Sequence, residues 1–399
     1  MGGAERLAPA RSGGAEGATP QVDPHPMLLL IPGPVQTRAE TRAAMARDIA
    51  PWDLDFHAVY AGIRERVRAT AGGVAGEHAT LPIQGAGHFI MEAAIRTFVR
   101  PGGKILIPLN GSYATRMARL AREAGRSVVP LEAPDTRPVS GDAIRRALEA
   151  DPAISHVSVV HSETGSGIVN DPEEIGAAVR AAGRRLILDS VSAFGVLPFE
   201  LSKHPECDAV VFTSGKCLEG LPGIGFSVAR IDRVTECAGN AGSWSFDLSD
   251  VYAHALRSGW GSFRFTPPVQ ALGAFDVALD LYEREGGQPA RLARYTENSR
   301  ILYEGLQALG LTPYVEKRFQ GPIIVTVHQP RDPAFKLQGF VDALKARGVL
   351  ISNFFNTVAP SFRVGCIGAI EAEAMHFAVQ AMDAALGELG VADRARAGA

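Results

Sequence analysis

The sequence predicts an α/β fold: a mainly parallel sheet covered by helices on both faces, followed by a smaller C-terminal α/β domain. Short β-branched segments alternate with helical patterns along the chain, and these strand-like segments are apolar throughout. From about Gly261 the sequence pattern changes, and a second series of predicted helices and strands begins. Strands that are apolar on both faces are typical of parallel sheets buried between helices.

Four segments are predicted to be strands of the large sheet. They are KILIPL, SHVSVVHS, RRLILDS and DAVVFTS, at 104–109, 155–162, 184–190 and 208–214. Helical patterns occur at 113–124 and 171–182, where apolar residues recur every three or four positions. In such sheets ligands bind at the carboxyl ends of the strands, so we expect a site in the loops that follow them.

The C-terminal part begins with a Pro-Pro pair at 267–268 and a helical pattern over 269–285, which EGGQPARLARY at 285–295 interrupts. The elements expected after it are a helix at about 291–309, a strand at 322–329, a helix at 335–346, strands at 348–352 and 361–368, and a helix at 370–388. We expect a disordered tail over 1–25, rich in Gly, Ala, Pro and Arg, a large domain over 26–275 and a small domain over 276–399.

Composition excludes several classes of protein. The net charge of −3 gives no electrostatic basis for binding nucleic acid or an anionic membrane surface. Four cysteines without a CxxC pair argue against a disulfide scaffold and a structural zinc site, so no metal is expected. With 46% hydrophobic residues but no apolar stretch long enough to span a bilayer, the chain is predicted to be cytoplasmic.

Lys216 stands out because it directly follows an apolar strand, in VVFTSGKCLEGLPGIGF (210–226). Lysine is rarely buried without a partner, since removing an ammonium group from water costs several kcal/mol. Either the side chain turns back to solvent, or its nitrogen is required at that place. A P-loop is excluded because the GxxxxGK[ST] spacing is absent, and no GxGxxG motif supports a dinucleotide fold.

Other strand ends carry residues that suit one ligand. PIQGAGHF (82–89) puts small residues at a helix start, where exposed amides bind phosphate, although a plain tight turn is equally compatible. Asp189 ends a buried strand, either as a helix N-cap or as the partner of a protonated ring nitrogen. Thr164 offers a hydroxyl beside it, and Tyr113 is either a core residue or a group that stacks on a flat ring.

These residues fit pyridoxal phosphate better than other cofactors. It needs a lysine for a Schiff base, an acid at its pyridine nitrogen and a phosphate-binding cup. Lys216 and Asp189 end consecutive strands and match the first two needs. A desolvated lysine has a lowered pKa, which makes the amine reactive and explains its position.

The chain resembles the class V (fold type I) aminotransferases, and most of all the branch that uses 2-aminoethylphosphonate and pyruvate. The similarity covers about 27–386. It is carried by LIPGPVQT, RDIAPWDLDF, SGKCLEGLPGIGF, FRFTPPV, EGGQPARLARY and FRVGCIG. The resemblance implies a seven-stranded sheet, a pyridoxal-phosphate-dependent transaminase that gives phosphonoacetaldehyde and L-alanine, and a homodimer with shared active sites.

By the same resemblance, Lys216 forms the Schiff base and Asp189 pairs with the pyridine nitrogen. Tyr113 stacks on one face of the ring, and Val191 lies against the other. The remaining residues implied for the site are Gly85, Ala86, Gly87 and His88 around the phosphate, Thr266 reaching that phosphate from a second subunit, and Arg363 for the anionic end of the substrate.

The chain departs from the phosphonate branch at three places. Gly-Ala-Gly-His replaces Gly-Ser-Gly-Thr in the phosphate loop, and His88 is typical of the alanine–glyoxylate branch. Gly215 precedes the lysine where the wider class often has an amide side chain, and 351–362 lacks the usual Pro-Gly-Lys loop. An alanine– or serine–glyoxylate aminotransferase, or one for a modified aminophosphonate, therefore remains the alternative. A non-catalytic binding protein on the same fold is a further one.

Overall fold

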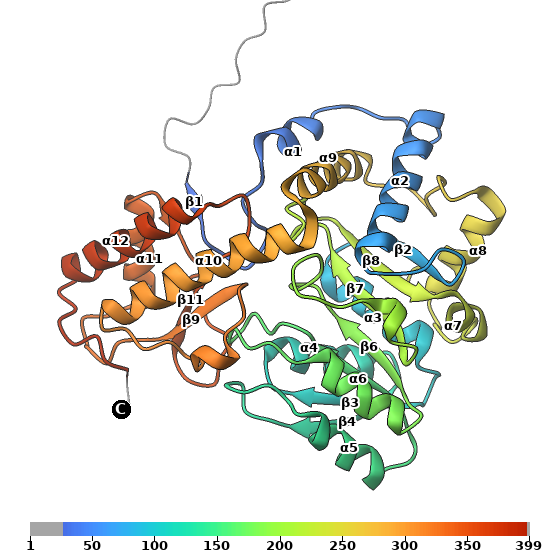
Figure 1. The fold of residues 1–399 in the computed structure, drawn as a ribbon, viewed down its shortest axis with the longest axis horizontal. Coiled ribbons are helices and arrows are strands. Elements are labelled where there is room, and N and C mark those ends of the chain that lie inside the picture. Colours follow the sequence, from blue (N-terminus) through green and yellow to red (C-terminus); the bar gives the residue numbers. More distant parts are fainter. Residues whose placement is uncertain (1–26, 397–399) are drawn as a thin grey trace, which may run out of the picture.

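The computed structural model describes residues 27–396, and its elements form two groups joined by the long helix α10 (Gly287–Ala308) (Figure 1). The larger group is built on a seven-stranded sheet of order β2-β8-β7-β6-β5-β3-β4. In that order the strands are His78–Gln84, Ile224–Arg230, Cys207–Thr213, Arg185–Asp189, Ile154–Val160, Lys104–Leu109 and Ser127–Glu132. Only β8 is antiparallel to its neighbours, so the prediction of a mainly parallel sheet is confirmed.

Successive residues of a strand pack into two separate apolar cores, one on each face of the sheet, because side chains alternate across a sheet. Leu186 and Leu188 of β6 join one core, whereas Ile187 between them joins the other. The first core is closed by α2 (Leu54–Thr70), α5 (Gly141–Ala150), α6 (Pro172–Ala181) and α9 (Val269–Glu285). The second is closed by α3 (Gly87–Phe98), α4 (Ser112–Glu123), α7 (Ile231–Glu236) and α8 (Leu248–Ser258). The strands are therefore apolar on both faces.

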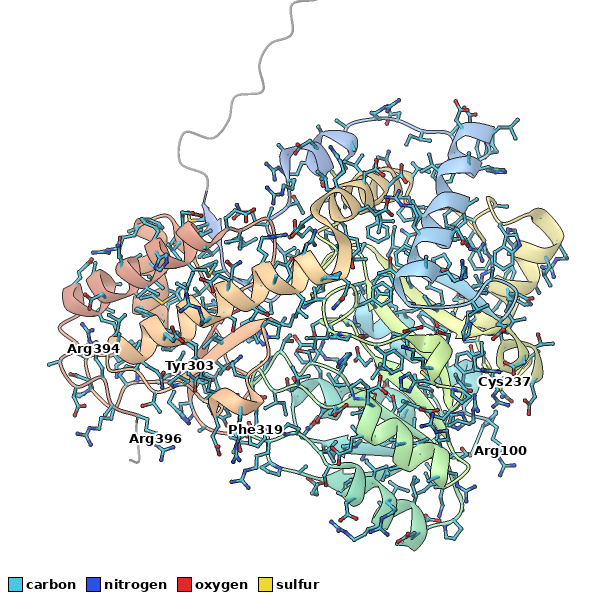
Figure 2. All side chains as sticks on the ribbon, viewed as in Figure 1. Arg100, Cys237, Tyr303, Phe319, Arg394 and Arg396 are labelled. Carbon is cyan, nitrogen blue, oxygen red and sulfur yellow. The ribbon has the colours of Figure 1, made fainter. Side chains whose placement is uncertain are left out.

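The smaller group has its own apolar core, to which Leu30 from the start of the described chain also belongs. Its two sheets pair β9 with β11 and β1 with β10. The elements are β1 (Leu28–Leu29), β9 (Ile324–His328), α11 (Leu337–Ala346), β10 (Val349–Leu350), β11 (Ser361–Gly365) and α12 (Ala372–Glu388). Side chains fill the space between these layers, and the Tyr303 hydroxyl of α10 donates to the Val315 carbonyl at 3.1 Å (Figure 2).

The predicted strands of the large sheet are confirmed to within two residues at each end. The junction of α9 and α10 differs from the prediction. No loop separates the two helices, because Gly286 and Gly287 turn the chain with φ of +112° and +68°. The helix α10 therefore begins at Gly287, before the start predicted near 291. The division of domains at 275/276 stays a prediction, and the predicted tail over 1–25 lies outside the described residues.

The short helix α1 (Ala39–Ala44) packs against α9 at the edge of the larger group (Figure 1). Two 3₁₀ turns, Leu201–Lys203 and Lys317–Phe319, complete the regular structure. Across residues 27–396, no helix combines the length and the apolar character needed to cross a membrane.

Candidate active site

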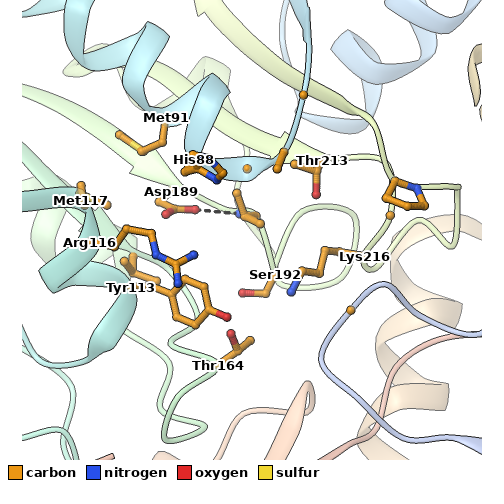
Figure 3. Close-up of a pocket in the computed structure, with 18 of the residues that line it drawn as sticks. His88, Met91, Tyr113, Arg116, Met117, Thr164, Asp189, Ser192, Thr213 and Lys216 are labelled. Atoms are coloured by element: carbon orange, nitrogen blue, oxygen red, sulfur yellow. Dashed lines mark hydrogen bonds between the residues drawn. The ribbon is translucent and has the colours of Figure 1, made fainter. Parts of the chain in front are cut away.

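The carboxyl ends of the parallel strands surround a cavity of about 540 Å³ (Figure 3). Its lining includes nine of the residues predicted from the sequence: Gly85, Ala86, Gly87, His88, Tyr113, Thr164, Asp189, Val191 and Lys216. They come from the loops after five different strands and meet because parallel strands end at one edge of the sheet. The structure thus places most of the predicted site in one hollow.

Lys216 lies in the turn after β7 and points into this cavity (Figure 3). Its Nζ donates a hydrogen bond to the Pro32 carbonyl at 2.6 Å. No carboxylate of the described chain comes within ion-pair distance of it. Burial lowers the pKa of Lys216, although Tyr113 and Asp189 oppose the change. The lysine is thus a desolvated amine, as the sequence suggested.

A buried ionic cluster, not foreseen from the sequence, fixes the backbone just after Lys216. Glu219 is buried with a φ of +56°, a strained conformation for a residue with a side chain. Its carboxylate accepts hydrogen bonds at 2.7 Å from both Arg294 and the Tyr295 hydroxyl. Arg294 also bonds Glu285, at the end of α9. The cluster ties the lysine turn to the α9–α10 junction.

Asp189 ends β6 at the floor of the cavity. Burial raises its pKa to about 6, although the N–H of Val191, 3.0 Å from Oδ1, and the charges of Lys216 and Arg116 favour the ionised form. A carboxylate in this position gains most from a cationic N–H donor placed above it. The site thus calls for a protonated nitrogen next to Asp189.

Tyr113 projects from the first turn of α4 towards Lys216 and Thr164 (Figure 3). Burial alone would raise its pKa. The positive charges of Lys216 and Arg363 and the contact with the Thr164 hydroxyl outweigh burial, so the pKa of the phenol is lowered. The guanidinium carbon of Arg116, one turn further along α4, lies over the tyrosine ring, 4.9 Å from its centroid. Arg116 also lines the cavity, and the sequence analysis did not single it out.

The start of α3 faces the same cavity. Its N-cap is Ala86, which has no side-chain acceptor for the first amides of the helix. Such free N–H groups bind phosphate. Gly85 has a φ of +141°, and a Cβ there would overlap the ring of Phe89. The loop therefore needs glycine to bring its backbone to the cavity.

Arg363 lies on β11 and reaches the site from the smaller group. The side chain is buried, its Nη1 donates to the Thr164 carbonyl at 2.8 Å, and the ring of Phe354 lies 4.7 Å from its guanidinium carbon. Its Nε is buried and has no acceptor in the described chain. A guanidinium with an unused donor edge suits a carboxylate or a phosphonate.

Thr266 does not line this cavity. It lies on a separate hollow together with Phe89, Arg264 and Phe265. Its expected role, reaching the phosphate of a second subunit, stays a prediction. Ser192 and Thr213 do line the cavity and were not predicted. Neither stands in a recognisable motif, so the sequence offered no signal for them.

The described residues fit pyridoxal phosphate. The carboxylate of Asp189 would hold its ring nitrogen, the amine of Lys216 its aldehyde, and the amides at the start of α3 its phosphate. Val191 lies close to Gly87, where a Cβ would come within 3.1 Å of its Cγ2, and both residues line the cavity, so the valine gives it an apolar contact for a ring. Arg363 is not part of the cavity lining, but it bonds the carbonyl of Thr164, which is, and its unpaired Nε would be available to a substrate anion.

Comparison with known proteins agrees with this geometry. The family model described as Aminotransferase class-V matches residues 37–353. The chain is 42% identical to a 2-aminoethylphosphonate–pyruvate transaminase of Burkholderia ambifaria (strain MC40-6), over 92% of this chain and 97% of that protein. It is 40% identical to one of Pseudomonas entomophila (strain L48), over 92% and 98%.

Two solved structures share the fold. Pyridoxamine–pyruvate aminotransferase from Mesorhizobium loti superposes with a TM-score of 0.83 at 25% identity, over 92% of this chain and 93% of that one. Alanine–glyoxylate aminotransferase from Nostoc sp. gives 0.82 at 25% identity, over 93% and 97%. With a family match over most of its length and these relatives, the chain belongs to the class V aminotransferases.

Proposed function

We propose that the protein transfers the amino group of 2-aminoethylphosphonate to pyruvate, with pyridoxal phosphate as cofactor, giving phosphonoacetaldehyde and L-alanine. The observation that carries the proposal is the buried Arg363, which has an unpaired Nε, donates to the carbonyl of the cavity residue Thr164, and lies close enough to Lys216 and Tyr113 for its charge to lower the pKa of both. Relatives at 40% and 42% identity bear this name.

The chemistry is divided between the cofactor and the protein. When bound, the cofactor supplies an aldehyde that takes up the amino group and a ring that accepts electrons from the substrate carbon. Asp189 holds a proton at the ring nitrogen, since its carboxylate is the acid at the cavity floor. Lys216, once its amine is free, would remove the proton from the substrate carbon that carries nitrogen and return it to the cofactor carbon on the other side of that nitrogen.

The lowered pKa of Lys216 suits it to this role, because an amine must be unprotonated to act as a base. Arg363 binds the phosphonate of the donor and the carboxylate of pyruvate in turn. A planar guanidinium forms paired hydrogen bonds with either anion, which a lysine cannot do. One site thus accepts two differently shaped acids.

We also propose that the active protein is a cytoplasmic homodimer. Large apolar side chains around Thr266 support the dimer, because Trp244 is 71% exposed and Phe265 50% exposed in the single chain. A second copy that covered them would bring Thr266 to the neighbouring active site. Light scattering of the purified protein tests the state, and a monomer at micromolar concentration would contradict it.

The glyoxylate-type alternative is not favoured. The alanine–glyoxylate enzyme matches at 25% identity, well below the relatives named for the phosphonate. The test is a steady-state assay of phosphonoacetaldehyde formation from 2-aminoethylphosphonate, with pyruvate as acceptor (which yields alanine) set against glyoxylate (which yields glycine). We expect a clearly higher kcat/KM with pyruvate. A preference for glyoxylate, with alanine or serine as the better donor, would overturn the assignment.

A further inference from the structure

Glu163 is a buried carboxylate that the proposed reaction does not use. It follows β5, and its side chain has no exposed surface. Within residues 27–396 no basic side chain lies at ion-pair distance from it, so the charge is not balanced by a neighbouring cation. A buried acid without such a partner is costly and calls for another reason to be there.

Both oxygens of the Glu163 carboxylate accept hydrogen bonds from backbone amides. Oε2 accepts hydrogen bonds from the N–H groups of Tyr113 at 3.1 Å and Ala114 at 3.4 Å, and Oε1 accepts one from Gly165 at 3.0 Å. The N-cap of α4 is Gly111, which has no side chain to cap the helix. Glu163 therefore caps α4 from fifty residues further along the chain.

The fit around this carboxylate is close. A Cβ at Gly111 would overlap Cγ and Cδ of Glu163. Any residue other than glycine would therefore push the carboxylate away from the start of α4. A helix cap supplied by a distant residue ties two segments together, whereas an ordinary local cap only ends a helix.

The two segments joined here are both parts of the active site. Tyr113, whose amide Glu163 binds, is the second residue of α4. On the other side, Gly165 closes the turn that presents Thr164, and the carbonyl of Thr164 accepts the Arg363 hydrogen bond. The Thr326 hydroxyl also donates to the carbonyl of Gly165 at 3.0 Å.

We propose that Glu163 is a positioning residue, which fixes the Tyr113 ring against Lys216 and, through the turn at Thr164, the guanidinium of Arg363. The inference rests on the proposed function only for the meaning of Tyr113 and Arg363 as site residues. Burial raises the pKa of Glu163 to about 7, against the effect of the three amides, so tests belong at pH 8, where the carboxylate is ionised.

The test compares Glu163→Gln with Asp171→Asn. Glutamine keeps the shape, but its NH₂ group must face at least one backbone N–H, so one buried donor loses its acceptor. Asp171 caps α6 by accepting from the amides of Glu173 and Glu174, away from the cavity, and controls for the general loss of a capping carboxylate. Hydrogen exchange of the apoprotein over 110–118 and 163–168, the two segments whose amides Glu163 binds, and titration with pyridoxal phosphate are the two readouts.

We expect Glu163→Gln to exchange about tenfold faster in at least one of the segments 110–118 and 163–168 and to bind pyridoxal phosphate about tenfold more weakly, as expected for one buried amide left unpaired. Asp171→Asn should change neither. In a Tyr113→Ala background the affinity loss from Glu163→Gln should shrink to less than half on a logarithmic scale, because the residue acts through the tyrosine.

Unchanged exchange and affinity in Glu163→Gln, or an equal loss with and without Tyr113, would overturn the proposal. If Glu163→Gln does not accumulate as folded protein, both measurements are made instead with Glu163→Asp, alone and in the Tyr113→Ala background. Aspartate keeps the charge and withdraws the carboxylate by one methylene. Neither readout involves an amino donor. A parent protein that ignores 2-aminoethylphosphonate would therefore refute the proposed function and leave this test intact.

Discussion

Lys216 Nζ donates a hydrogen bond to the carbonyl of Pro32, 184 positions earlier in the chain. Gly33 and Pro34, which follow Pro32, line the same cavity. The start of the described chain is therefore a wall of the active site, while Leu30 just before it packs in the core of the smaller group. This segment connects the reactive lysine with the part of the protein that carries Arg363.

Replacing Gly33 with alanine should damage the site directly. Gly33 has a φ of +132°, and a Cβ there would lie 2.6 Å from Cδ of Lys216. We expect kcat to fall at least about tenfold, since the added Cβ would displace the Lys216 side chain, and misplacing a reacting group by about 1 Å can cost on the order of a hundredfold. The control is Gly239→Ala, at an exposed glycine with a φ of +90° and open space around it. Equal activity in the two variants would contradict the close contact.

Lys216→Ala should lose turnover by about a thousandfold or more, because both the covalent attachment and the proton transfer depend on this amine. The fold should persist, since Lys216 is only partly buried and forms no ion pair with a carboxylate of the described chain, so its removal leaves no buried charge without a partner. Circular dichroism and the thermal midpoint check the fold, and an alanine-formation assay checks activity. Turnover within tenfold of the parent would show that another group does this work.

Asp189→Asn should separate stability from function. The folded pKa of Asp189 is about 6, above its ordinary value of 3.8, so its contribution to stability is present below pH 4 and is lost as the pH rises through 6. We therefore expect the apo variant to be more stable than the parent at pH 8, by about 2 kcal/mol, and equal to it near pH 4. Urea unfolding at both pH values measures the difference.

The same variant should bind pyridoxal phosphate more weakly and turn over slowly, because a neutral amide does not hold a proton at the ring nitrogen. A parent and variant of equal apo stability at pH 8 would mean that Asp189 is well solvated. Unchanged turnover would remove Asp189 from the mechanism.

Arg363→Lys should raise KM for both 2-aminoethylphosphonate and pyruvate, by about a hundredfold, because paired hydrogen bonds are replaced by a point charge. Phe354→Ala, which removes the ring over the guanidinium and leaves its donors in place, is the matched control and should change KM far less. Steady-state kinetics with each substrate varied gives the answer. A rise for one substrate alone would show that the two acids bind at different places.

Much of the fold could be predicted because it follows from local pattern. The β-branched segments ending at Asp189 and before Lys216 are strands as expected, and ligand-facing residues collect at their carboxyl ends. The helix break was predicted within 285–295, but its form was not, because two positive-φ glycines turn the chain with only Gly286 between the helices.

The site residues that escaped prediction depend on contacts between distant parts of the chain. Glu219 is held by Arg294 and Tyr295, more than seventy positions away, and Pro32 meets Lys216 across a still longer separation. Arg116 belongs to the exposed pattern of an amphipathic helix, where a charged side chain is ordinary. No spacing rule marks such residues before the chain is folded.

The most direct test of the central claim is the absorption spectrum of the protein with pyridoxal phosphate, recorded before and after adding 2-aminoethylphosphonate and then pyruvate. The account predicts a visible band from cofactor bound to Lys216, its conversion to the pyridoxamine form by the phosphonate, and its return with pyruvate. A band that responds only to alanine or serine would contradict the phosphonate assignment. Absence of any such band would contradict the role of Lys216 itself.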